Sequence, residues 1–384
     1  MQFQLSEEHL MIQKAARDFA NSECLPGVIE RDELQQFPRE QVMQLAELGF
    51  MGMMVTPAYG GSGMDSISYV LAMEEISKVD ASVSVCMSVN NSLVCFGLQE
   101  YGDETQKQKY LVPLAQGKKE GQLYIGAFLL SEPEAGSDAT SQQTTAEDKG
   151  DHYLLNGTKN WITNGNNASV YLVIAQTDIS KGSRGINAFI VEKEWAGVMV
   201  GAKENKLGIR GSDTHSILFN DVKVPKENRI GADGFGFKFA MKTLAGGRIG
   251  IAAQALGIAG GAYERSLAYS KQRKAFGKEI MHHQIIQFKL ADMATKIECA
   301  RLLCLKAAWE KDQQLDYTVS SSMAKVFASE TAMWTATEAV QIHGGYGFVK
   351  EYHVERLMRD AKITQIYEGT SEIQRIVIGR SILK

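Results

Sequence analysis

Apolar residues recur with a helical period near the start of the chain. Met11, Ala15 and Phe19 repeat every four residues behind Ser6, a residue type that often caps helix N-termini. This spacing predicts an amphipathic helix with one apolar face. Glycines within residues 60–63 then interrupt the pattern, and a second apolar helix is expected from about Ile67. Residues 1–120 are therefore predicted to form a helical domain.

The period changes to that of β-structure in residues 121–230. Apolar and β-branched runs, separated by turn residues, occupy residues 170–175, 186–191 and 216–219, as expected for strands. Asn156-Gly157 lies between two further runs and is a strong signal for a two-residue hairpin turn. The middle region is therefore predicted to be a small antiparallel β domain.

A helical pattern returns in residues 231–384. Spacings of four and three alternate along Ile286, Leu290, Met293, Ile297, Ala300, Cys304 and Ala307. This period keeps one seam of a helix facing its neighbours in a bundle. Further helices are predicted over residues 237–273, 319–342 and 372–383. The expected fold class is α+β: an N-terminal helical domain (1–120), a middle β domain (121–230) and a C-terminal four-helix bundle (231–384).

Composition narrows the classes of partner. The chain has 384 residues, 44% of them hydrophobic and 22% charged, which is ordinary for a globular protein. Its net charge of −4 argues against a nucleic-acid binder. No run of eighteen apolar residues is present, so no membrane span is expected. The five cysteines are scattered without metal-ligand spacing, which predicts no zinc site and a reducing, cytoplasmic location.

Glu368 is a candidate catalytic residue because of its setting. Gly369 permits a tight turn behind it, and Ser371 with Gln374 has the spacing of a capping box that starts the last helix. The carboxylate would then lie beside a helix N-terminus, where backbone N–H groups can also receive an anion. From these features alone, a solvated surface charge on a capped turn is the more common interpretation.

Three other segments could approach a cofactor. Residues 131–138 form a turn of small residues that would let a backbone reach a phosphate or a ring, or would simply connect two strands. Trp161 and Thr163 lie two apart in a predicted strand, so one face could cover a heterocycle or pack into the core. Residues 341–347 contain three glycines, more than a helix C-cap requires. No strand–GxGxxG–helix unit is present, which disfavours a nicotinamide-binding Rossmann enzyme.

Taken together, these segments resemble the acyl-CoA dehydrogenase family over essentially the whole chain. The resemblance rests on separated motifs in the family order: Leu130-Ser131-Glu132-Pro133, Ala135-Gly136-Ser137-Asp138, Trp161-Ile162-Thr163-Asn164, Arg273-Lys274-Ala275-Phe276-Gly277, Gln341-Ile342-His343-Gly344-Gly345-Tyr346-Gly347, Met358-Arg359-Asp360-Ala361 and Tyr367-Glu368-Gly369-Thr370. Any one motif could arise by chance, whereas all of them together are highly specific.

The resemblance implies an FAD enzyme with a defined set of contacts. Glu368 would remove the α-proton of an acyl-CoA thioester while the β-hydrogen passes as hydride to flavin N5. Acyl-CoA would contact Ser137, Arg248 and Gly369. The expected FAD contacts are Phe128, Leu130, Ser131, Ser137, Trp161, Ile162, Thr163, Arg273, Gln284, Gln341, Ile342, His343, Gly344, Gly345, Thr370, Ser371 and Glu372. Some of these are expected to reach the FAD of a neighbouring subunit in a homotetramer, and electron-transfer flavoprotein is the expected electron acceptor.

Two sequence features bear on the type of family member. Gly247 occupies the position where some members carry an alternative base, so Glu368 is the only matched carboxylate. Residues 87–93 and 247–252 are most similar to short-chain, butyryl-type members. An acyl-CoA oxidase or a branched-chain dehydrogenase on the same fold stays an alternative, as does a flavin-free helical interaction protein that keeps the scaffold.

Overall fold

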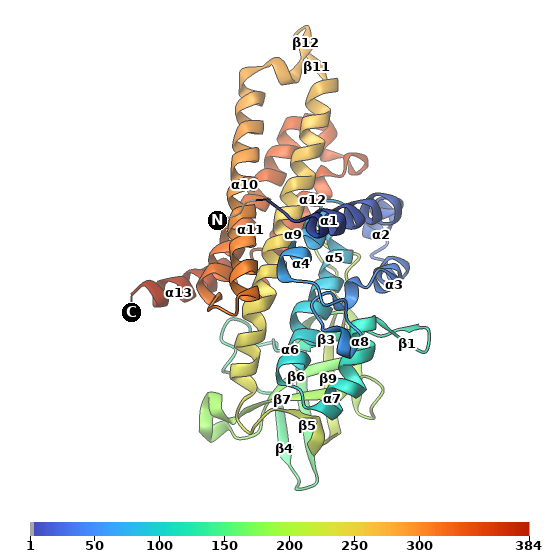
Figure 1. The fold of residues 1–384 in the computed structure, drawn as a ribbon, viewed down its shortest axis with the longest axis vertical. Helices are drawn as coiled ribbons and strands as arrows, with labels where there is room; N and C mark the ends of the chain where they lie inside the picture. The colour runs from blue at the N-terminus through green and yellow to red at the C-terminus, as the bar shows by residue number, and fades with distance from the viewer. Residues whose placement is uncertain (1–3, 384) are drawn as a thin grey trace.

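The computed structural model describes residues 4–383, and its three regions follow one another along the chain (Figure 1). Helices α9–α11 form a tall column, the N-terminal helices pack against its side, and the main sheet lies at its lower end. The N-terminal and C-terminal helices share one apolar core that runs from Ile12 to Ala361. The division at about residues 120 and 230 stays a proposal, and residues 1–3 and 384 lie outside the described part.

The N-terminal region is helical, as predicted. Its helices are α1 (Glu7–Phe19), α2 (Val28–Glu33), α3 (Arg39–Glu47), α4 (Ser66–Ser77), α5 (Ala81–Ser88), α6 (Phe96–Tyr101), α7 (Glu104–Gln106) and α8 (Val112–Gln116). Short π-helical turns join several of them: η1 (Ala20–Cys24), η4 (Val89–Cys95) and η5 (Lys107–Leu111). The predicted apolar helix near Ile67 is α4.

The first helix begins as predicted but buries a different face. Ser6 caps α1, its side chain accepting a hydrogen bond from the backbone N–H of His9. Met11 is 72% exposed, and Ala15 is exposed too. The prediction of the apolar face was therefore wrong for these two residues. The stripe against α4 contains Ile12, Ala16 and Phe19, because spacings of four and three both fit a helical period and packing against a partner selects between them.

Residues 81–101 form a continuous helical stretch through the core. By length and composition the stretch could cross a bilayer, since an 18-residue window within it has a mean hydropathy of 1.4. However, 94% of that window is buried inside the protein. A core helix passes the same test of length and composition as a membrane span. The amide of Asn90 donates to the carbonyls of Met51 (2.8 Å) and Leu114 (2.9 Å), which anchors the stretch within the protein.

The middle region contains one large sheet and a small hairpin. The main sheet has the order β10-β7-β6-β4-β5-β9-β8, with β3 paired to β6. Its strands are β3 (Gly126–Leu129), β4 (Thr145–Asp148), β5 (His152–Thr163), β6 (Val170–Gln176), β7 (Ile186–Glu192), β8 (Val198–Lys203), β9 (Thr214–Pro225) and β10 (Arg229–Ile230). The hairpin pairs β1 (Lys118–Lys119) with β2 (Gln122–Leu123). Most pairs are antiparallel, as predicted, but β3 runs parallel to β6, so the sheet is mixed.

The predicted hairpin at Asn156-Gly157 is wrong, because β5 continues through both residues. The pairing with β9 shifts between Leu155 and Gly157, which marks a β-bulge. Gly157 has φ of 140°, and a Cβ there would lie 2.7 Å from the Cα of Thr144. The Asn156 amide donates to Asp221 at 3.0 Å. Residue types that favour a hairpin turn therefore serve here to bend one long strand.

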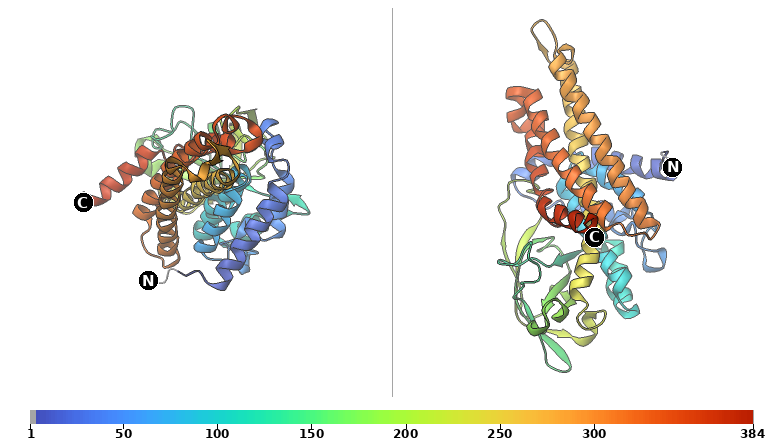
Figure 2. Two further views of the ribbon diagram at one scale, coloured as in Figure 1. Left: turned by 90° about the horizontal axis from the view of Figure 1, so that it is seen from above. Right: turned by 90° about the vertical axis from the view of Figure 1, so that its left-hand side faces the viewer.

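The C-terminal region contains the predicted helices and one more. These are α9 (Gly236–Gln272), α10 (Gln284–Asp312), α11 (Thr318–His343), α12 (Val354–Ile363) and α13 (Ser371–Ile382). A short hairpin of β11 (Lys274–Ala275) and β12 (Lys278–Glu279) lies at the top of the column. The predicted α10 seam is buried from Met293 to Ala307, whereas Ile286 and Leu290 are half-buried. Helix α13 projects away from the body in two views (Figures 1 and 2).

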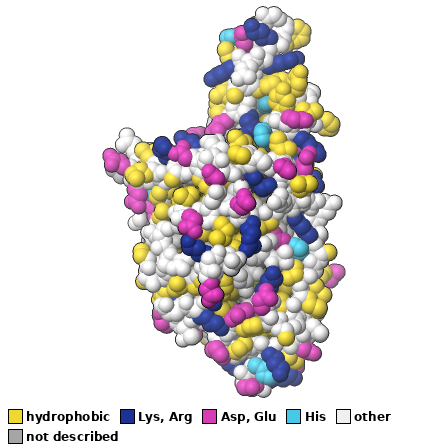
Figure 3. Space-filling model, turned by 90° about the vertical axis from the view of Figure 1, so that its right-hand side faces the viewer, with side chains coloured by type: hydrophobic (Ala, Val, Ile, Leu, Met, Phe, Trp, Pro, Cys, Tyr) yellow, Lys and Arg dark blue, Asp and Glu magenta, His cyan; other side chains and the backbone are white. Residues whose placement is uncertain are grey.

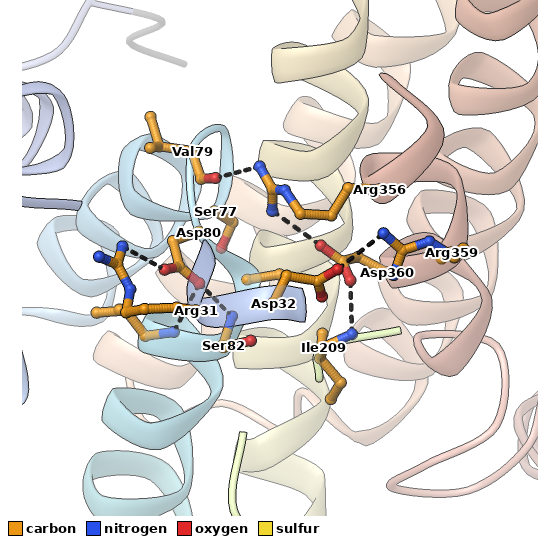
Figure 4. Close-up of polar contacts among 12 residues, drawn as sticks. Arg31, Asp32, Ser77, Val79, Asp80, Ser82, Ile209, Arg356, Arg359 and Asp360 are labelled. Carbon is orange, nitrogen blue, oxygen red and sulfur yellow. Dashed lines mark hydrogen bonds and ion pairs between the residues drawn. The ribbon is translucent and has the colours of Figure 1, made fainter. Parts of the chain in front are cut away.

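Ion pairs and hydrogen bonds around α12 join all three regions (Figure 4). Asp360 accepts hydrogen bonds from the backbone N–H of Ile209 in the β8–β9 connection (2.5 Å) and from Arg356 (3.0 Å). Arg356 also donates to the carbonyl of Val79 at 2.7 Å, and Arg359 pairs with Asp32 at 2.8 Å. Burial raises the pKa of Asp360 to about 6. This junction fixes α12, which leads directly to the Glu368 turn.

Candidate active site

Glu368 lies in a turn between α12 and α13 that adopts two successive left-handed conformations. Its own φ is 51° and that of Gly369 is 92°. A left-handed conformation is costly for a residue other than glycine and persists only where its surroundings hold it. The amide of Gln374 donates to the carbonyls of Glu368 (3.1 Å) and Gly369 (2.8 Å). Lys325 donates to the carbonyl of Gly369 at 2.7 Å.

The capping of α13 differs from the prediction. The N-cap is Thr370, whose hydroxyl accepts from the backbone N–H of Ile373 at 3.3 Å. Ser371 is instead the first helical residue. Gln374 does not complete a capping box, because its side chain reaches back to the turn. The predicted position of Glu368 beside the helix N-terminus is correct, although the capping residue was predicted one position too late.

The carboxylate of Glu368 lies directly against α9 at Gly247. A Cβ on Gly247 would be 2.1 Å from Oε2 of Glu368 and 2.7 Å from Cδ2 of Leu93. Oε2 is inaccessible to solvent and has no hydrogen-bond partner among the described residues. Burial raises the pKa of Glu368 to about 8, opposed by the positive charges of Lys325 and Arg248. This carboxyl group can therefore hold or accept a proton near neutral pH.

The neighbours of this carboxylate come from elements far apart in the sequence. Leu93 belongs to the π-helical turn η4, a kind of distortion that is often found at functional sites. Arg248 follows Gly247 on α9 and is buried, and its Nη1 donates to the Ser322 hydroxyl at 3.2 Å. The hydroxyl of Tyr317 lies 3.8 Å from where a Cβ of Gly246 would be. Glu368, Arg248 and Gly369, predicted separately, thus lie together.

The predicted flavin-ring segments gather near the lower part of α9. Phe128 in β3 stacks on Phe239 of α9, with ring centroids 6.3 Å apart. Phe239 precedes Gly247 by eight residues of helix, a rise of about 12 Å. The backbone N–H of Asn160 donates to the carbonyl of Ser131 at 2.9 Å, which joins the 131 and 161 segments. Leu130 and Ser131 are half-buried, whereas Ser137 is exposed.

Trp161 and Thr163 do not sit in a regular strand. A register shift lies between Lys159 and Ile162, and Trp161 has φ of 62°. The strict alternation behind the same-face prediction is therefore interrupted. Trp161 is 61% exposed, Ile162 is buried and Thr163 is half-buried. An exposed indole beside a half-buried hydroxyl fits the stacking and polar contact that a flavin ring requires.

Most of the remaining predicted cofactor residues lie at the opposite end of the column, whereas Thr370, Ser371 and Glu372 follow the Glu368 turn at the start of α13. Arg273 caps the C-terminus of α9, 26 helical positions beyond Gly247, or about 39 Å along the axis. Its guanidinium lies over the ring of Tyr346, 5.5 Å from the centroid. Gln284, Gln341, Gly344 and Gly345 are exposed, and a Cβ on either glycine would meet nothing within 4 Å. Open backbone of this kind suits a phosphate contact.

Two predicted residues of this group have buried side chains that pack against or bond to other residues of the bundle. Ile342 is buried in the bundle core. His343 is also buried, stacks on Tyr269 with centroids 4.2 Å apart, and its Nδ1 pairs with the carbonyl of Ala339 at 2.7 Å. Any cofactor contact at these two positions would therefore be made by the backbone.

Sequence reasoning missed Lys325 and Gln374. A signal for Lys325 existed: it lies four residues after Ser321 and three before Ala328, on the buried stripe of α11. A lysine on such a stripe is rarely buried without a specific partner. Gln374 was noticed only as a capping residue. Its true partners are carbonyls of the turn, which depend on left-handed angles that the sequence pattern does not specify.

Comparisons with known proteins agree with this geometry. Three acyl-CoA dehydrogenase domain profiles match in order: the N-terminal domain at residues 6–118, the middle domain at 127–222 and the C-terminal domain at 234–383. The short-chain specific acyl-CoA dehydrogenase of Clostridium acetobutylicum is 50% identical over 384 residues, with 100% of both chains covered.

Solved structures agree as well. Butyryl-CoA dehydrogenase from Megasphaera elsdenii superposes with a TM-score of 0.97 at 49% identity, covering 100% of both chains. A chain in a structure described as the electron transferring flavoprotein of Acidaminococcus fermentans gives a TM-score of 0.98 at 50% identity, again over 100% of both chains. With profiles spanning nearly its whole length and half of its residues shared with such relatives, this chain belongs to the acyl-CoA dehydrogenase family.

Proposed function

We propose that this chain is an FAD-dependent dehydrogenase that converts a short-chain acyl-CoA of the butyryl-CoA type into the trans-2-enoyl-CoA, with Glu368 as the base. The observation that carries the assignment of the base is the buried Oε2 atom of Glu368, which faces Gly247 and has no hydrogen-bond partner within residues 4–383. The relatives named for short-chain and butyryl-CoA substrates support the substrate class.

The residue types fit the chemistry of the reaction. The α-hydrogen of a thioester is a weak acid, so its removal needs a base of raised pKa and stabilisation of the enolate oxygen. Burial gives Glu368 a pKa of about 8. The backbone N–H of Glu368 donates to no acceptor among the described residues and would be available to the thioester carbonyl. FAD, when bound, supplies the acceptor for the β-hydride.

The residues that would hold FAD form two groups on this chain. Phe128, Leu130, Ser131, Trp161 and Thr163 would hold the ring, near the Glu368 site. Arg273, Gln284 and residues 341–345 would hold the phosphates. About 39 Å of helix separates Arg273 from Gly247, which is farther than one FAD molecule extends. We therefore assign the second group to the FAD of a neighbouring subunit.

The exposed surface around Arg273 supports an assembly of several subunits. Phe276, between β11 and β12, is 97% exposed, and Phe348 is 86% exposed. Figure 3 shows hydrophobic side chains gathered with lysines and arginines on the part of the bundle that projects beyond the body. Exposed apolar patches of this kind mark interfaces. We propose a homotetramer, as the family resemblance suggests.

We propose electron-transfer flavoprotein as the electron acceptor and the cytoplasm as the location. The likeness to a chain in the Acidaminococcus fermentans electron transferring flavoprotein structure supports the acceptor. All five cysteines are free, which suits a reducing compartment. An oxidase that passes electrons to oxygen would instead form peroxide rapidly with butyryl-CoA, and an assay for peroxide distinguishes the two activities.

The test of the proposed base is Glu368→Gln. This change keeps the size of the side chain but removes the basic oxygen, so one FAD per chain and acyl-CoA should still bind. Flavin bleaching after anaerobic mixing with butyryl-CoA should slow by roughly 10²–10⁴-fold or more. The exposed Glu40 on α3 provides a control, since Glu40→Gln should bleach at the normal rate. Near-normal bleaching in Glu368→Gln would show that another group is the base.

A further inference from the structure

Lys325 is a buried lysine that contacts the catalytic turn. It lies on α11 with no exposed surface, and its ammonium group donates to the carbonyl of Gly369 at 2.7 Å. The carbonyl of Gly369 is the next peptide group after that of Glu368. A buried charge is costly unless a specific partner compensates it, so this contact is specific to the turn.

The turn needs external support because of its backbone geometry. Glu368 has φ of 51°, a conformation that is costly for a residue other than glycine. Lys325 and Gln374 both donate to the carbonyl of Gly369, and Gln374 also donates to that of Glu368. These three hydrogen bonds fix the direction in which Glu368 leaves the backbone, and hence its contact with Gly247.

Charge is the second link between Lys325 and the carboxylate. The pKa of Lys325 is lowered to about 8, first by burial, while Glu368 acts in the opposite direction. At pH 7 the amine is therefore still mostly protonated. Arg248 on α9 acts on the pKa of both groups, and Glu372 on α13 acts on that of Lys325. Glu368 in turn raises the pKa of Tyr69 on α4 and of Tyr367 in the turn. Lys325 has the largest opposing effect on the raised pKa of Glu368, and Arg248 the second.

We propose that Lys325 is a positioning residue for the base: its hydrogen bond holds the Glu368–Gly369 turn, and its charge favours the proton-accepting form of Glu368. The proposal rests on Glu368 being the base. Lys325 acts through Glu368 and need not touch the substrate.

Three variants separate the two contributions. Lys325→Met removes both the hydrogen bond and the charge at similar length. Lys325→Gln removes the charge and keeps a donor. Gln374→Met removes uncharged donors from the same turn and is the matched control. The main measurement is the rate of flavin bleaching by subsaturating butyryl-CoA between pH 6 and about 10, which in the wild type should rise with pH and level off above about 8.

Both lysine variants should shift the midpoint of this profile upward by about one pH unit or more, because an opposite charge at short range shifts a pKa by that amount. At pH 7 this shift alone is about a tenfold loss of rate. Gln374→Met should lower the plateau and leave the midpoint in place. In the oxidised enzyme without substrate, the infrared band of the protonated Glu368 carboxyl, assigned by its loss in Glu368→Gln, should persist to the same higher pH.

The proposal fails if both lysine variants keep the wild-type midpoint in the bleaching profile and in the infrared titration. A loss of plateau rate equal to that of Gln374→Met, without a shift, would reduce Lys325 to a structural role. Failure of the proposed base gives a different result: Glu368→Gln would then bleach normally whatever the lysine variants do.

Discussion

Gly247 determines where the Glu368 carboxylate can lie. Its missing side chain leaves room for Oε2, which sits 2.1 Å from the position that a Cβ would take. Cδ2 of Leu93 lies 2.7 Å from the same Cβ position. The proposed base is therefore buried against a helix backbone with an apolar side chain nearby, and this burial raises its pKa.

Gly247→Ala should displace the base without removing it. The added methyl group would force Oε2 to move by about 1 Å or more, since Cβ contacts below 3 Å are not tolerated. A misplacement of about 1 Å can cost roughly 10²-fold in rate. We expect slower flavin bleaching with normal FAD content. Gly379→Ala on α13, where the new methyl group meets nothing within 4 Å, should bleach like the wild type, and equal rates in the two variants would contradict the packing argument.

At the scale of elements, the π-helical turn η4 forms part of the wall of the candidate active site. Asn90 within it is fully buried and makes three hydrogen bonds to other segments: it donates to the carbonyls of Met51 and Leu114 and accepts from the backbone N–H of Gly126 at 2.9 Å. These bonds join the N-terminal helices to the first long strand of the sheet. The same turn presents Leu93 to Gly247.

Asn90→Ala should destabilise the fold, because the buried carbonyl of Met51 and the buried N–H of Gly126 lose the amide that pairs with them, whereas the carbonyl of Leu114 still accepts from the N–H of Gly117. Each such group costs about 1–3 kcal/mol, so the midpoint of thermal unfolding should fall clearly. The matched control is Asn166→Ala, an exposed position whose loss should change stability by no more than about 0.5 kcal/mol. A thermal melt of both variants tests this, and an unchanged Asn90→Ala midpoint would show that water replaces the amide.

At the scale of the whole molecule, the two groups of cofactor residues imply shared sites. Arg273 lies 26 helical positions along α9 from Gly247, which Glu368 contacts, and it is followed closely by the exposed Phe276. Arg273→Ala should lose FAD more readily on dilution, because a charge-assisted contact to phosphate is removed.

Mixed oligomers test the sharing directly. Subunits carrying Arg273→Ala and subunits carrying Glu368→Gln should each be inactive or weak alone. Co-expressed with two different tags, they should form hybrids in which an intact Glu368 meets an FAD held by an intact Arg273 of the partner. Recovered butyryl-CoA oxidation in the doubly purified hybrid is the expected result. Hybrids with no more than the mean activity of the two parents would place both residues at the FAD of one subunit.

The sequence by itself determined the order of regions and predicted Glu368 as the base. Apolar residues spaced three and four apart show which stretches are helices. The motif around Glu368 can likewise be recognised from neighbouring residues alone. Long periodic segments such as α9–α11 were therefore predicted to within a few residues. Prediction was weaker wherever two local signals were equivalent, as with Met11 and Ile12 on α1, because only a packing partner distinguishes two stripes of one helix.

Tertiary structure decided the features that depend on contacts between distant segments. Asn156-Gly157 became a bulge because β9 and Thr144 lie beside it. Lys325 became part of the site because α11 packs beside the turn, where the lysine donates to the carbonyl of Gly369. The raised pKa of Glu368 also has this origin, since burial is a property of the packed elements and not of the motif. Local sequence specifies which groups are available, and the packing of distant elements sets their distances and their dielectric surroundings.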